Sequence, residues 1–139
     1  MLTFEHTKRL QDCKEDGERE VVVELRLDRH DRGNVAVLKC KGRLTVGVPS
    51  LVFCEAFQDA LRTHRWVLLD LTGVAKIDCG ALGVLAGCLE MAYHQNRTVR
   101  CCGASKIVRE VLELTRLGRF MRFYDTETSA LEALSVCAA

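Results

Sequence analysis

One stretch of this chain constrains the fold more than any other, because an apolar run leads through a short turn into an acidic residue and then a helical pattern. The run covers residues 66–71, and its near-continuous apolar character is typical of a central strand covered on both faces. Asp78 then stands ahead of leucines at helical spacing, where it is expected to cap a helix. The chain is therefore expected to present the first N–H groups of a helix near the end of a buried strand, and such a helix start attracts negative charge.

The rest of the chain alternates between strand-like and helix-like patterns. Residues 21–27 alternate between apolar and polar, the cluster 30–34 is typical of a turn, and residues 35–40 are β-rich, so a hairpin is predicted. Thr72-Gly73 is interpreted as a turn. Further helices are predicted over residues 51–63, 79–95, 106–117 and 126–134, with short strands over residues 98–102 and 120–124. Ser50, Asp78 and Ser105 are the predicted N-caps.

The predicted order of elements is β-β-α-β-α-β-α-β-α. It implies an α/β domain with a mixed, mostly parallel sheet of about five strands and about four helices, to which the opening hairpin adds an antiparallel edge. At 139 residues the chain suits one domain, assigned to residues 20–136. Residues 1–19 are mostly polar and are interpreted as an extension with a short helix around residues 7–14. The exposed edge of the hairpin allows a homodimer.

Composition excludes several classes of function. The formal net charge of +1 leaves no basic excess for a dedicated nucleic-acid binder. No apolar run is long enough to cross a bilayer, and no secretory segment is recognised, so a cytoplasmic protein with reduced thiols is expected. The eight cysteines show neither C-x-x-C nor paired zinc-ligand spacing, and no metal or other cofactor is predicted. Cys101 and Cys102, on one short strand, are expected to point to opposite faces as core thiols.

Several segments, in this order, resemble the STAS domain family, which includes bacterial anti-sigma factor antagonists. Residues 68–78 resemble the strand and turn that lead to the regulatory site of the family, and residues 82–85 resemble the start of its second helix. Residues 105–115 are similar to its third helix, and residues 123–131 contain the pattern of its closing strand and helix. The likeness covers about residues 20–135 and implies the SpoIIAA-like fold.

The resemblance implies a regulatory protein-binding module and no enzyme. Members of this type bind a kinase-like anti-sigma factor that holds a sigma factor inactive. Phosphorylation of the antagonist at the start of its second helix ends this binding, because the phosphate adds nearly two negative charges to the contact. The residues predicted at the partner contact are Lys76, which precedes the motif, and Asp78, Cys79, Gly80, Leu82 and Gly83 within it.

The sequence departs from the family pattern at the position that accepts phosphate. The aspartate of the family corresponds to Asp78, and the serine after it falls on Cys79, with Gly80 at the next Ser or Thr position. Cys79 is therefore the phosphoacceptor-equivalent position, and it is not expected to be phosphorylated. Gly42-Arg43-Leu44-Thr45 also lacks the acidic residue that many relatives carry. The hypothesis is an antagonist that ordinary serine phosphorylation cannot switch off.

Other interpretations of the same residues stay open. Cys79 is either a small residue at a contact, a redox or modification switch, or a nucleophile, because a helix start favours the thiolate. Asp78 is either a cap alone or a cap that also touches the partner. For the whole protein, the alternatives are a scaffold or accessory subunit of a signalling assembly or membrane transporter, and a small thiol-dependent enzyme that uses Cys79.

Overall fold

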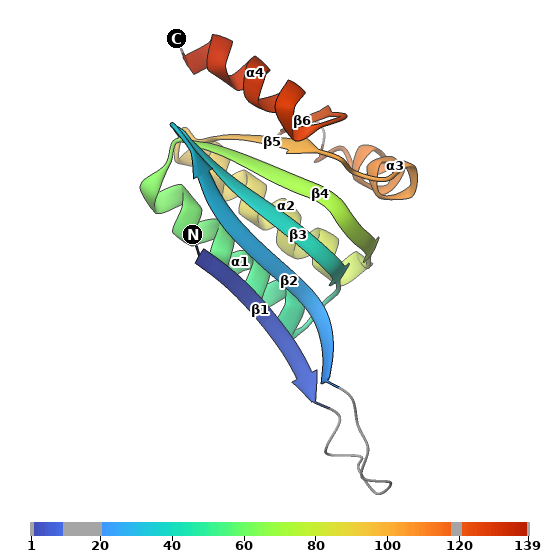
Figure 1. The fold of residues 1–139 in the computed structure, drawn as a ribbon. Coiled ribbons are helices and arrows are strands. Elements are labelled where there is room, and N and C mark those ends of the chain that lie inside the picture. Colours follow the sequence, from blue (N-terminus) through green and yellow to red (C-terminus); the bar gives the residue numbers. More distant parts are fainter. Residues whose placement is uncertain (1, 10–20, 118–120, 139) are drawn as a thin grey trace, which may run out of the picture.

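A six-stranded sheet runs through the structure and places its helices on two faces (Figure 1). The structure is a computed structural model that describes residues 2–9, 21–117 and 121–138, and side-chain environments within residues 25–117 and 121–134. The strands are β1 (Leu2–Arg9), β2 (Val21–Arg32), β3 (Val35–Leu44), β4 (Trp66–Ile77), β5 (Thr98–Cys102) and β6 (Met121–Tyr124). The helices are α1 (Val48–Thr63), α2 (Cys79–His94), α3 (Lys106–Leu114) and α4 (Glu127–Ala138).

The order of the strands across the sheet follows their order in the chain. β1, β2 and β3 are antiparallel neighbours, and β3 to β6 are parallel and joined through α1, α2 and α3. The predicted fold is confirmed from β2 onward. One further strand, β1, precedes it and pairs along β2 from Leu2 opposite Arg29 to Arg9 opposite Val21. The helix predicted around residues 7–14 is wrong for residues 7–9, and its remainder lies outside the described residues. The domain boundary at residue 20 stays a prediction.

Two local predictions need correction. α1 begins at Val48 rather than after Ser50, because Pro49, with its preset backbone angle, occupies the first turn. Ser50 lies inside the helix and donates its hydroxyl to the Thr45 carbonyl at 2.6 Å. Thr72-Gly73 is not a turn, since β4 continues to Ile77 and pairs Gly73 with Lys41. Shifts in the β3–β4 register between residues 39 and 43 accommodate the longer strand.

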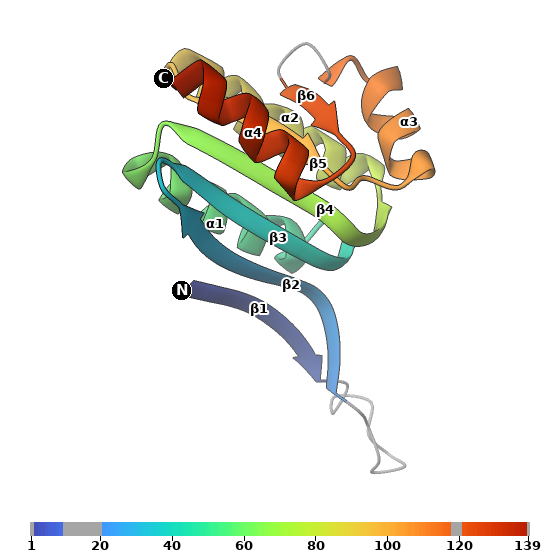
Figure 2. The same cartoon turned by 45° about the horizontal axis from the view of Figure 1, so that its top comes forward.

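The larger core lies between the sheet and α1, α2 and α3, as Figure 2 shows for the first two, and α4 covers the opposite face over a smaller core. Phe53 and Phe57 of α1 and Leu69 of β4 belong to the larger core. The smaller core contains Val35, Val37, Leu68, Cys102, Ala130 and Leu134. Cys101 lies in the larger core and Cys102 in the smaller one, which confirms that these neighbours face opposite sides of the sheet.

Candidate functional site

The candidate site lies where two chain connections meet at the carboxyl ends of β3 and β4. Leu44 and Ile77 are paired at the ends of these strands, and the Asp78 N–H donates to the Leu44 carbonyl at 3.3 Å. The β3–α1 connection is thereby held beside the start of α2. Carboxyl ends of parallel strands are where α/β folds commonly place their functional residues.

The Asp78 carboxylate ties the two connections together. Its Oδ1 accepts the Ala81 N–H at 2.8 Å, which confirms the predicted cap, and both carboxylate oxygens lie 3.1 Å from the Val46 nitrogen. The hydrogen bonds from Ala81 and Val46, together with the positive charge of Lys76, hold the pKa of Asp78 below its ordinary value. One ionised side chain therefore fixes both the start of α2 and the loop that faces it.

Stability is expected to depend on Asp78 at acidic pH. Because the folded-state pKa lies below the unfolded value of about 3.9, the carboxylate contributes fully above about pH 5, and this contribution is lost as pH falls through the folded-state pKa. Urea unfolding of the wild type and of Asp78→Asn between pH 7 and pH 3 measures it. The gap in unfolding free energy should stay constant above about pH 5 and close below it. A gap that widens toward low pH would contradict this role.

Gly80 allows the two connections to approach closely. A Cβ built at Gly80 would lie 2.5 Å from Val46 Cβ and 2.7 Å from its Cγ2, so a side chain at Gly80 would displace Val46. Gly83, one turn further along α2, has open space in the same position. Gly80 therefore has a steric reason to lack a side chain, whereas nothing crowds Gly83, and the contact role of both glycines stays a prediction.

The surface around this junction is apolar and exposed. Val46, Val48 and Leu51 have exposed fractions of 61%, 47% and 66%, and they follow one another through the loop and the first turn of α1. Cys79, Gly80 and Gly83 are exposed on α2, and Lys76 is exposed on β4. Leu82 is only partly exposed and packs against the larger core, so it supports the surface more than it forms it. Solvent-exposed valine and leucine side chains beside a fixed helix start are typical of a protein contact.

The apolar part of this surface was not predicted from the sequence. Val46 and Val48 flank a glycine before Pro49, and such a segment predicts an ordinary loop. The one available signal was Leu51, which falls outside the buried stripe of its helix.

The three histidines whose side chains the structure describes make their contacts away from Cys79. His30 lies 3.3 Å from Glu127, and His64 contacts Arg29 at 3.2 Å. His94 is at the far end of α2 from Cys79 and packs edge-on against Tyr93. Among the side chains that the structure describes, no cluster of His, Cys, Asp and Glu is arranged to hold a metal ion.

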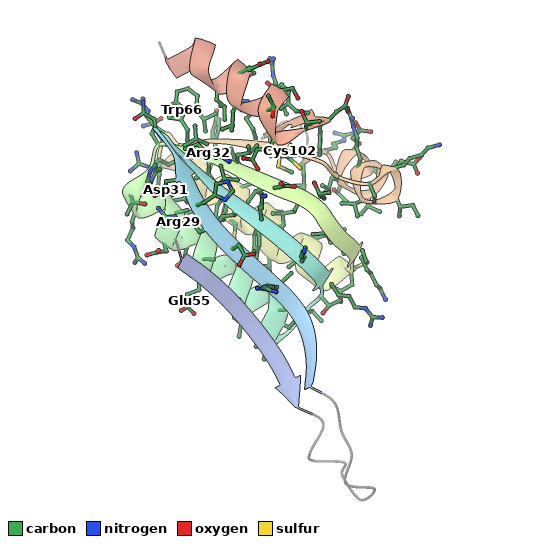
Figure 3. All side chains as sticks on the ribbon, viewed as in Figure 1. Arg29, Asp31, Arg32, Glu55, Trp66 and Cys102 are labelled. Carbon is green, nitrogen blue, oxygen red and sulfur yellow. The ribbon has the colours of Figure 1, made fainter. Side chains whose placement is uncertain are left out.

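A second polar cluster lies at the opposite end of the sheet, around Arg29 (Figure 3). Arg29 is 5% exposed and donates to Asp31, Asp59 and Thr63 at 3.1, 3.1 and 2.6 Å. The adjoining shallow pocket of about 350 Å³ is lined by Gly33, Asn34, Thr63, His64, Arg65 and Trp66. Because the guanidinium is already bonded to protein acceptors on β2 and α1, this cluster joins two elements and is not a candidate binding site.

The fold is that of a known family. The STAS domain family matches residues 26–130, which is most of the chain. This chain belongs to the STAS domain family. The match spans the described elements from β2 to the beginning of α4, and thus includes both connections of the candidate site.

Individual members of the family are similar over most of their length. An anti-sigma F factor antagonist of Paenibacillus polymyxa is 27% identical over 110 residues, covering 77% of this chain and 92% of that protein. A Thermotoga maritima structure, provisionally described as an anti-sigma factor antagonist, has a TM-score of 0.69 with 24% identity and covers 77% and 92% of the two chains. The unphosphorylated Bacillus antagonist SpoIIAA has a TM-score of 0.65 with 15% identity, and the match covers 78% of this chain and 96% of SpoIIAA. The structural likenesses establish the STAS fold of this chain.

No helix in the described part of the chain is long and apolar enough to cross a membrane.

Proposed function

We propose that this protein is a cytoplasmic bacterial anti-sigma factor antagonist that acts by binding a kinase-like anti-sigma factor and has no catalytic activity of its own. The observation that carries the proposal is the Asp78-tied junction, which presents an apolar surface at the start of α2. The family membership and the antagonist relative support the choice of partner class.

The contact surface in this proposal is formed by two connections. From β4 and α2 come Lys76, Asp78, Cys79, Gly80 and Gly83, with Leu82 packed beneath them. Val46, Val48 and Leu51 add the apolar area that such a contact requires, because burial of apolar surface drives most protein association. Asp78 touches the partner only secondarily, since its oxygens are already occupied by the Ala81 and Val46 N–H groups.

The second part of the proposal concerns the switch. Cys79 is exposed at the first position of α2, and its resemblance to the family motif makes it equivalent to the phosphoacceptor serine. A phosphate at this position would add nearly two negative charges in the middle of an apolar contact and so oppose capture. A thiol is not a normal substrate of a serine kinase, and so this antagonist stays competent to bind in the presence of ATP.

Both parts are tested with the full chain immobilised and exposed to lysate of the source organism, with and without ATP. A kinase-like anti-sigma factor should be retained in both conditions by the wild type. Immobilised Cys79→Ser should retain the anti-sigma factor equally well without ATP, but with ATP it should become phosphorylated and release the anti-sigma factor. Cys54→Ser is the matched control, because it places a serine on α1, and it should neither become phosphorylated nor release the anti-sigma factor.

The outcomes separate the parts of the proposal. Phosphorylation of the wild type near residue 79 would contradict the proposal that serine phosphorylation cannot switch this antagonist off. It would not affect the proposed class of partner. Retention only of transporter or signalling-assembly subunits would replace the antagonist role by that of a scaffold or accessory subunit. Reaction of Cys79 with an alkylating probe far faster than that of other exposed thiols would favour the thiol enzyme.

A further inference from the structure

Two cysteines that are far apart in the sequence meet between α1 and α2. The Sγ atoms of Cys54 and Cys88 are 3.6 Å apart, and both thiols are free. The two helices lie side by side on the same face of the sheet (Figure 1). We propose that Cys54 and Cys88 form a redox modification site, at which a low-molecular-weight disulfide of the glutathione class reversibly converts the two thiols into a disulfide that links α1 to α2.

The pair has the proximity that this reaction needs. A disulfide requires the sulfurs to approach to about 2.05 Å, so they must close by about 1.5 Å from their present contact. Among the six cysteines whose side chains the structure describes, this is the one pair joined by a sulfur–sulfur hydrogen bond. Cys79 is exposed on the first turn of α2 and lies nine residues before Cys88, which is two and a half turns of the helix.

The two thiols differ in exposure, which sets the order of their reactions. Cys88 is 3% exposed, and burial together with the adjacent Cys54 raises the pKa of Cys88 to about 12. Cys54 is partly exposed, and its sulfur accepts a hydrogen bond from the Gln58 side-chain amide at 3.5 Å. Cys54 is therefore the thiol that meets the oxidant, and Cys88 is the resolving thiol behind it.

The reaction balances without a metal or a further cofactor. Cys54 loses its proton, and the thiolate attacks one sulfur of the small disulfide, whose S–S bond breaks and whose departing half takes up a proton as a thiol. Cys88 then loses its proton and attacks Cys54 Sγ in the mixed disulfide, and the second small thiol is expelled and protonated. The small disulfide is reduced to two thiols, and the protein dithiol is oxidised.

The bond would join the two helices that carry the candidate surface. The cross-link spans 34 positions of the sequence, and closing such a loop restricts the unfolded chain. Oxidation is therefore expected to raise the melting temperature by several degrees. This inference does not depend on the proposed partner, because it concerns the chemistry of two thiols in the free protein.

The test uses the full folded chain incubated with glutathione disulfide, then alkylated in denaturant so that every remaining thiol can react, and mapped by mass spectrometry without reduction. We expect two of the eight cysteines to escape alkylation, a peptide pair joined through Cys54 and Cys88, a mass lower by about 2 Da, and reversal by dithiothreitol. Cys79→Ser should form the same link, and Cys54→Ser should form none.

Three results with the wild type would overturn the proposal. The first is glutathione that stays attached to Cys54 in the wild type while Cys88 is still alkylated. The second is a link that involves Cys40, Cys101 or Cys102 instead. The third is full alkylation of both thiols after incubation, in protein whose circular dichroism shows it to be folded. Cys88→Ala, folded by the same criterion, should trap the mixed disulfide on Cys54, and its failure to do so would also count against the mechanism.

Discussion

Replacing Gly80 with alanine is expected to weaken capture of the anti-sigma factor at least tenfold, which corresponds to about 1.4 kcal/mol of binding free energy. The added Cβ would lie 2.5 Å from Val46 Cβ, a distance that real side chains do not adopt, so Val46 and its loop must move. The Val46 N–H is held by Asp78, and the displacement therefore disturbs both connections of the contact surface. Calorimetric titration of the purified partner measures the loss.

Gly87→Ala is the matched control for this prediction. It lies in the same helix, and a Cβ there meets nothing within 4 Å. Alanine is more favourable than glycine inside a helix by up to about 1 kcal/mol. This variant should therefore be slightly more stable than the wild type and should bind the partner normally. Equal losses of binding in the two variants would show that the glycines act through the helix as a whole, and not through the Val46 contact.

Truncating Phe57 to alanine is expected to lower the free energy of unfolding by about 3–5 kcal/mol. Phe57 is 0% exposed on α1 and stacks on Phe53 with ring centroids 5.8 Å apart, so the deletion leaves a cavity between the helix and the sheet. Domains of this kind are stable by about 5–15 kcal/mol in total, and this variant should lose a large part of that. Urea denaturation followed by circular dichroism gives the difference.

The same helix supplies the contrast for this variant. Leu51→Ala removes a side chain that is 66% exposed, and its free energy of unfolding should change by no more than about 0.5 kcal/mol. Because Leu51 belongs to the proposed contact surface, capture should nevertheless weaken. If Leu51→Ala lowered the free energy of unfolding as much as Phe57→Ala does, the start of α1 would belong to the hydrophobic core and not to the contact surface.

The sequence predicted those features of the fold that local patterns encode. The apolar run 66–71 identified β4, and the caps at Asp78 and Ser105 were confirmed, since each side-chain oxygen accepts the N–H of the residue three positions later. The alternation of elements then fixed the parallel sheet. The continuation of β4 through Thr72-Gly73 was missed, because pairing with β3 overrides the turn preference of these two residues.

The site depends on contacts between distant segments, and these are the contacts that local patterns do not encode. Asp78 was predicted as a cap, but its bond to Val46 spans 32 positions of the chain. The neighbours of Gly80 and the meeting of Cys54 with Cys88 arise in the same way, from the packing of elements on one face of the sheet. β1 was missed because its polar sequence gives little sign of a strand until β2 offers it an edge.

The order of the strands across the sheet has a consequence for how the chain acquires its structure during synthesis. Every strand is bonded to the strand that precedes it in the chain, from β1 to β6. A strand that leaves the ribosome therefore finds its neighbour already made, and no strand must be inserted later between two others. From β2 onward each pairing closes a loop of one turn or one helical crossover, which costs less entropy than pairing with a more distant strand and favours stepwise growth from the amino terminus.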